Sequence, residues 1–173
     1  MIAPNVPPPI RVELKFFALA LWLIGCMFYI WRISLIFYRY TFFNFSPADL
    51  SPPYWINMGA MAISTLAGSQ LILNAGDAPL LHDMLPFIRG FTVFYWATGT
   101  WWIPMLLFLG VWRHWLKHFP FRYDPLYWGA VFPLGMYSVS TERMTEALHI
   151  SFLGGLPKVF LTLGMLAWTV VFV

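Results

Sequence analysis

The stretch FFALALWLIGCMFYIWRISLIFY, residues 16–38, decides the class of fold. Arg32 is its single charged residue, and a helix of about 20 apolar residues is long enough to cross the hydrocarbon core of a bilayer. The stretch is too long for the apolar core of a signal peptide, and no basic segment precedes it between Met1 and Ile10. We therefore predict a retained transmembrane helix over residues 16–38.

The composition indicates that lipid surrounds this chain. Hydrophobic residues make up 60% of its 173 residues and charged residues only 10%, whereas a soluble domain carries roughly a quarter charged residues. So few charges cannot cover a globule of this size in water. The aromatic share of 20%, with 10 Trp, is typical of side chains that settle at the membrane interface. The net charge of +3 indicates loops beside anionic lipid, and we expect no nucleic-acid partner.

Further apolar runs predict four more membrane helices. Prolines, glycines and polar residues mark the breaks between them, at residues 46–53, 74–79 and 154–157. No long polar linker separates the runs. We predict an all-α integral membrane protein that forms a single transmembrane domain over residues 1–173, with about five helices at residues 16–38, 56–74, 88–111, 126–148 and 156–173.

Basic residues predict the orientation in the membrane. The concentrated basic loop RHWLKH, residues 113–118, is followed by Arg122 and connects the third helix to the fourth. The positive-inside rule places such a loop in the cytoplasm. The N-terminus then lies outside and the C-terminus lies in the cytoplasm, in what we expect to be a bacterial inner (plasma) membrane. Over the whole chain, loop included, the ten Lys and Arg residues divide five against five between the two sides, so the prediction rests on the concentration of basic residues in this loop.

An internal repeat relates the second helix to the fourth. The segments PYWINMG, residues 53–59, and PLYWGAVFP, residues 125–133, share a Tyr-Trp pair, and aligning the pairs places Thr65 opposite Ser138. A more uniformly apolar helix follows each segment. The pattern predicts two helical hairpins of one kind after a lone first helix. In transporters built from such repeats, the working site lies at the interface between the repeats.

Two segments resemble the tellurite-resistance/dicarboxylate transporter family, which includes the slow-type anion channels of plant guard cells. They are SPPYWINMGAMAISTLAGS, residues 51–69, and YDPLYWGAVFPLGMY, residues 123–137, and the resemblance continues through FYWAT at 94–98 and WWIP at 101–104. It implies a ring of five helical hairpins whose inner helices line a pore, in trimers that conduct anions or carry dicarboxylates. The chain resembles only the second half of that ten-helix fold. We therefore expect a truncated product, a fragment or one half of a split system with a missing N-terminal half.

Phe132 and Pro133 form the candidate pore gate. A proline inside a helix removes one hydrogen bond and bends the helix. Membrane helices tolerate such a break where protein or a water-filled cavity covers it. By the resemblance, Phe132 matches the aromatic residue that plugs the pore of the family. From the residues alone, a proline kink beside a core phenylalanine remains the open alternative.

Small and weakly polar residues are the candidates for the pore wall. Asn57, Ser64 and Gly68 are spaced seven and four residues apart, so they share one face of the second helix. Such a stripe suits a pore wall and equally suits close packing between helices, and both interpretations stay open. The full set of pore-lining candidates is Asn57, Gly59, Ser64, Gly68, Gly135 and Ser138.

Charged residues offer one candidate for a pore mouth. Arg143 lies about three helical turns after Phe132 on nearly the same face, where a cation would concentrate anions. The alternative is that Glu142 and Glu146 neutralise it at the interface. His114 and His118 are four residues apart, but no cysteine lies near them, and we expect no metal site.

The function predicted from these features is transmembrane transport by an anion channel or a dicarboxylate/tellurite-type transporter module. Its partners would be the lipid bilayer and small anions, together with further copies in a homotrimer or the missing N-terminal half. The sequence carries no phosphate-binding glycine loop, nucleophile elbow or metalloprotease motif, so we expect neither catalytic residues nor a cofactor. The alternative is a non-transporting membrane scaffold, or a subunit that needs a partner half.

Overall fold

The computed structural model describes residues 8–44, 46–50, 52–76, 78–120 and 123–173, and these ranges contain helices and no strands. The predicted all-α class is confirmed, and all five predicted helices are present. The long helices are α1 (Pro8–Phe42), α2 (Ile56–Leu73), α4 (Leu85–Val111), α5 (Trp128–Leu148) and α6 (Leu156–Phe172). The short ones are α3 (Pro79–Asp83), the 3₁₀ turns η2 (Pro52–Trp55) and η4 (Pro125–Tyr127), and the π-helical turn η3 (Trp112–Leu116).

The largest difference from prediction is the length of the first helix. It spans Pro8–Phe42, whereas the apolar run alone predicted residues 16–38. Hydropathy marks only the part of a helix that suits lipid, and α1 continues through polar turns at both ends. A second difference is α3, which begins at Pro79 inside a predicted turn, because proline is well suited to the first position of a helix. The predicted breaks at Ser51 and Asp77 lie outside the described residues.

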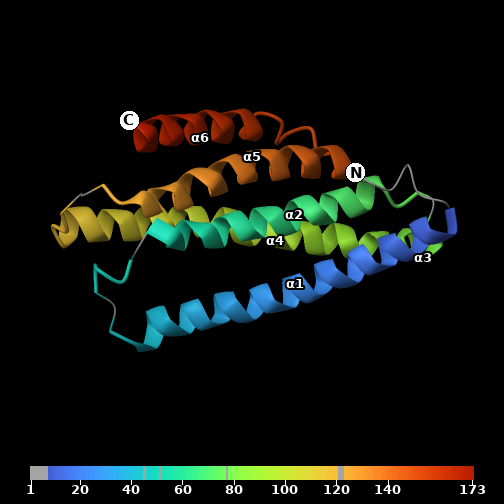
Figure 1. Cartoon of the computed structure of the whole chain (residues 1–173), viewed down its shortest axis with the longest axis horizontal. Coiled ribbons are helices and arrows are strands. Elements are labelled where there is room, and N and C mark those ends of the chain that lie inside the picture. The colour runs from blue at the N-terminus through green and yellow to red at the C-terminus, as the bar shows by residue number, and fades with distance from the viewer. Residues whose placement is uncertain (1–7, 45, 51, 77, 121–122) are drawn as a thin grey trace.

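The helices form an elongated bundle in which α2 occupies the middle (Figure 1). Helix α2 packs against α4 and α5, and α6 packs on the outer side of α5. Helix α1 lies on the opposite side, where it contacts α2 and α3. The pairs α2–α4 and α5–α6 are the two predicted hairpins, and α1 is the lone first helix.

Within the part of the chain that the structure describes, three segments are long and apolar enough to cross a membrane, namely residues 10–42, 56–73 and 85–116. Helix α6 is also apolar but has 17 residues, and α5 has a polar second half that contains Glu142, Arg143 and Glu146. Large apolar side chains such as Phe28, Phe108 and Val170 are exposed on α1, α4 and α6. These side chains make a surface that suits acyl chains.

Glycines, which have no side chain, let the neighbouring helices approach α2 closely. A Cβ atom on Gly68 would lie 2.2 Å from Thr92 Oγ1 of α4 and 2.8 Å from Trp22 Cζ2 of α1. On Gly99 of α4, it would lie 3.0 Å from Met61 Cβ of α2. Lipid tails are as apolar as the helix surfaces, so close packing of this kind, and not hydrophobic burial, holds membrane helices together.

Hydrogen bonds between side chains of different helices add to this packing. Trp96 Nε1 donates to Thr141 Oγ1 at 3.0 Å, and the Thr100 and Tyr137 hydroxyls lie 2.6 Å apart, so both pairs join α4 to α5. The Tyr95 hydroxyl of α4 donates to the carbonyl oxygen of Cys26 in α1 at 2.7 Å. These polar groups therefore have partners away from water, as the hydrocarbon core requires.

Replacing Gly68 tests the close contact at the centre of the bundle. We expect Gly68→Val to destabilise the protein by about 1–3 kcal/mol, because overpacking forces Thr92 and Trp22 apart. The measurement is thermal unfolding in detergent. Gly90→Ala is the matched control, since a Cβ atom at Gly90 meets nothing within 4 Å. Equal melting temperatures for Gly68→Val and the wild type would contradict the close contact.

Candidate functional site

A hollow of about 350 Å³ lies on the face of α2 between α1 and one side chain of α5. Helix α2 forms its floor through residues that recur every three or four positions, α1 forms one wall, and Phe132 of α5 closes the other side. The lining residues are Leu21, Trp22, Gly25, Cys26, Tyr29, Ile56, Ala60, Ile63, Ser64, Ala67 and Phe132. None of them is charged, so the hollow is a mostly apolar recess with a few weakly polar atoms.

Phe132 borders the hollow, whereas Pro133 lies in the contact between α5 and α2. The Phe132 side chain is 52% exposed and borders the hollow. Pro133 is buried against α2, where a Cβ atom on Gly59 would lie 3.0 Å from Pro133 Cγ. Successive helical residues point about 100° apart, so fixing the proline on α2 turns the phenylalanine outward. The α5 helix continues through Pro133, which lies near its start.

Two polar side chains that line the hollow, Trp22 of α1 and Ser64 of α2, already have hydrogen-bond partners. Trp22 Nε1 donates to the carbonyl oxygen of Ser64 at 2.9 Å, and the Ser64 hydroxyl donates to the carbonyl oxygen of Ala60 at 3.1 Å. The hollow therefore presents neither a charge nor an uncommitted donor from these two side chains. It could admit an anion but would not hold one tightly.

Two further predicted pore-lining residues, Gly59 and Gly68, lie in helix contacts. Gly59 lies against Pro133 and Gly68 against Thr92 and Trp22, and neither lines the hollow. For these glycines the geometry favours the packing alternative over the pore wall. Ser64 is the pore-lining candidate that borders the hollow.

The three other candidates are also engaged in local contacts. Asn57 is buried, and its Nδ2 donates to the carbonyl oxygen of Tyr54 at 3.2 Å. Ser138 is buried and donates to the carbonyl oxygen of Pro157 at 2.7 Å, which ties α5 to α6. Gly135 offers its backbone to α6, because a Cβ atom on Gly164 would lie 3.4 Å from the Gly135 nitrogen. The structure does not bring these residues together with Phe132 in the hollow.

Arg143 is exposed at the far end of α5 and forms an ion pair with Glu146 at 2.7 Å. This contact favours the neutralised alternative over an unpaired cation at a pore mouth. Elsewhere, among the residues that the structure describes, no group of three or more His, Cys, Asp or Glu side chains could hold a metal ion.

Sequence reasoning missed the α1 wall of the hollow. Leu19, Trp22 and Cys26 are the buried stripe of α1, and their spacing of three and four residues is helical. Every neighbouring residue in that stretch is apolar as well, so hydropathy alone does not distinguish the packed face from the lipid face. The indole of Trp22 was the available signal, because a buried indole needs an acceptor.

The fold and the hollow define a helical membrane protein whose packed inner helix carries an uncharged recess. The chain belongs to the voltage-dependent anion channel family, whose pattern it matches over residues 1–173. It is therefore a member of a transport family. No solved structure matches it.

Curated relatives of two lengths match the chain. It is 38% identical over 140 residues to an uncharacterized membrane protein of Mycobacterium tuberculosis, a match that covers 81% of this chain and 71% of the relative. An uncharacterized transporter of Methanocaldococcus jannaschii is 28% identical over 121 residues, which cover 70% of this chain and 34% of that transporter. A second uncharacterized transporter of the same archaeon is 25% identical over 130 residues, covering 75% and 36%. The matched segment is thus about a third of each archaeal transporter.

Cys26 reports on the α1 wall, because its side chain is only 1% exposed. We expect Trp22→Ala to speed modification of Cys26 by N-ethylmaleimide in detergent at least about tenfold, since losing a buried Trp costs well over the 1.4 kcal/mol that corresponds to tenfold. Trp31→Ala is the matched control, because Trp31 is 60% exposed on the same helix. Unchanged modification in Trp22→Ala would show that this contact does not hold α1.

Proposed function

We propose that this chain is a transport module that passes small anions along the exposed face of α2, with Phe132 as the gate. The observation that carries the proposal is the exposed Phe132 ring beside an uncharged hollow, next to a proline fixed on Gly59. The backbone at this point is held by helix packing, whereas the ring borders open space. A rotation of the ring would therefore open or close the recess without disturbing the bundle.

The uncharged lining supports a channel-like passage. Conduction requires binding that is favourable enough for an anion to enter and weak enough for it to leave, and a lining without a fixed counter-charge meets the second requirement. A dicarboxylate would bring two charges into the same recess, with no cation among the lining residues. Among the substrates of the resembled family, we therefore propose small inorganic anions before dicarboxylates or tellurite.

The hollow is open on one side, so the proposed conduit needs further walls. The matched segment is about a third of the length of the two archaeal transporters, which leaves them with additional chain. We propose that other polypeptides supply the remaining helices here, as a separate N-terminal half or as further copies in a homotrimer. The proposed setting is a bacterial inner membrane, with residues 113–118 in the cytoplasm and the N-terminus outside.

A second candidate function is a non-transporting scaffold or an accessory subunit. The observation that favours it is α1, which packs against α2 and α3 and leaves large apolar side chains exposed along much of its length. Such a surface suits a protein whose role is to bind another membrane protein. Flux measurements separate the two candidates.

Anion flux through proteoliposomes tests the proposal. The purified chain is reconstituted alone, and efflux of chloride and of malate is followed after a potassium diffusion potential is applied. We expect chloride flux that rises several-fold in Phe132→Ala, because truncation removes the ring from the recess. Phe172→Ala is the matched control, since Phe172 is exposed on α6, away from the hollow.

Each outcome has one meaning. Chloride flux that is the same in the wild type and Phe132→Ala would remove Phe132 from the mechanism. Absence of flux from both proteins would contradict a conduit completed by further copies of this chain, and would favour a subunit that needs a partner half. Malate flux above chloride flux would contradict the proposed preference for small inorganic anions.

A further inference from the structure

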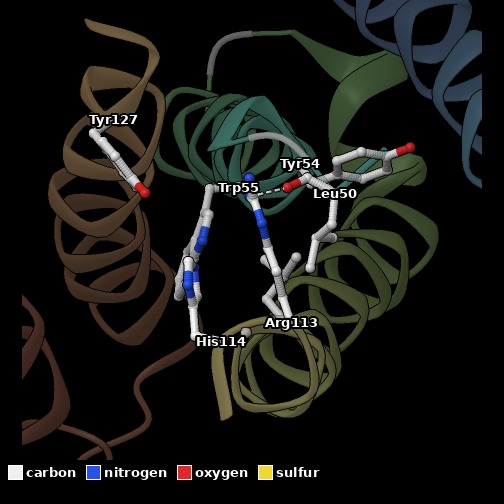
Figure 2. Close-up of a pocket in the computed structure, with 8 residues that line it drawn as sticks. Leu50, Tyr54, Trp55, Arg113, His114 and Tyr127 are labelled. Carbon is white, nitrogen blue, oxygen red and sulfur yellow. Dashed lines mark hydrogen bonds between the residues drawn. The ribbon is translucent and has the colours of Figure 1, made fainter. Parts of the chain in front are cut away.

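A second, smaller cavity lies at the C-terminal end of α4, next to the η2 turn that precedes α2 (Figure 2). Its volume is about 80 Å³, the space of a few water molecules at about 30 Å³ each. Figure 2 shows Arg113 and His114 extending from the η3 turn, which follows α4, toward the segment that holds Leu50 and Trp55. The lining residues are Leu50, Tyr54, Trp55, Leu106, Gly110, Arg113, His114 and Tyr127.

Arg113 brings a partly buried positive charge into this cavity. One terminal nitrogen of its guanidinium donates to the carbonyl oxygen of Leu50, and the guanidinium carbon lies 4.4 Å from the centre of the Phe119 ring. Its Nε atom is buried and has no hydrogen-bond partner. The ion pairs found among the described residues, Arg39–Asp49 and Arg143–Glu146, do not include it. A guanidinium in this position lacks the counter-charge that normally offsets desolvation.

Two acids, Asp49 and Asp124, lie close in sequence to the lining residues Leu50 and Tyr127, and both accept hydrogen bonds within their own turns. Asp49 accepts hydrogen bonds from the Ser46 nitrogen at 2.9 Å and the Ser46 hydroxyl at 2.8 Å, and it also pairs with Arg39. The hydrogen bonds from Ser46 lower the pKa of the Asp49 carboxyl, so it stays ionised and held there. Asp124 accepts from the Leu126 nitrogen at 2.9 Å. Neither acid lines the cavity, which therefore keeps a positive character.

The backbone turn that follows α4 directs the side chains of Arg113 and His114 toward the cavity. Residues 112–116 form a π-helical turn, a rare feature that is frequent at functional sites. His114 Nδ1 lies 3.0 Å from the carbonyl oxygen of Phe119, which fixes the imidazole on the cavity wall. The following side chains, Trp115 at 76% and Leu116 at 67%, are exposed as at a membrane interface.

We propose that this cavity binds one phosphate group, either as free inorganic phosphate or as the headgroup phosphate of an anionic lipid, with Arg113 as the principal ligand. A guanidinium matches the oxygens of a phosphate and is weakly hydrated, so it suits a partly buried site. The cavity size restricts the bound group to one small oxyanion, whether free or at the end of a lipid. Lys117, exposed directly after this turn, would raise the local concentration of anions without entering the cavity.

Thermal unfolding and native mass spectrometry of the full chain in detergent test this site. The probes are inorganic phosphate, dioctanoyl phosphatidic acid and, as the phosphate-free comparison, dioctanoylglycerol, all at constant ionic strength. We expect one or both phosphate probes to raise the melting temperature by several degrees and dioctanoylglycerol to have no effect. Stabilisation by phosphatidic acid alone assigns the site to a lipid headgroup, whereas stabilisation by both probes admits free phosphate.

Two variants remove the site in different ways. Arg113→Gln should weaken binding by at least about tenfold, because a charged ligand is lost from a partly buried site. Gly110→Val keeps the arginine and fills the cavity, since a Cβ atom at Gly110 meets nothing within 4 Å. Lys117→Gln is the matched control and should retain binding. Equal stabilisation of all four proteins, or no stabilisation of the wild type by either phosphate probe, would overturn the proposal.

Discussion

Close packing around α2 is the constraint on which the rest of the structure depends. In lipid the helices gain little by burying apolar surface against one another, so contact between backbones and small side chains must hold them. Gly59 admits Pro133 of α5, and Gly68 admits Thr92 of α4 and Trp22 of α1. Three helices thus meet one central helix at positions that lack a side chain, and any larger residue there would separate them.

The same packing explains why one face of α2 remains open. Its two glycines, Gly59 and Gly68, face α5, α4 and Trp22, whereas the face that carries Ile56, Ala60 and Ile63 borders the hollow. Pro133 is held on α2, which turns Phe132 toward that recess. The candidate gate is therefore a consequence of helix packing. Family membership supplies the reason to connect an open, uncharged face with anion passage.

The sequence predicted the helices well, because hydropathy and proline breaks report directly on what lipid and backbone geometry require. It placed α2 and α5 within a few residues of their observed bounds. It could not separate pore wall from packing at Gly68 or Ser138, because small residues serve both roles and only the neighbours distinguish them. The Arg113 cavity could not be predicted from the sequence either, because its lining residues Leu50 and Tyr127 and the π-helical turn come from separate parts of the chain.

The most direct measurement of the central claim is the access of water to position 132 in intact membranes. In a Cys26→Ala background, Phe132→Cys is treated with a charged methanethiosulfonate reagent, and Leu161→Cys, where the native side chain is 54% exposed on α6, serves as the lipid-facing comparison. The account predicts rapid modification at position 132 and none at position 161 until the membrane is dissolved. Protection of both cysteines in the membrane would contradict it, because Phe132 would then face acyl chains.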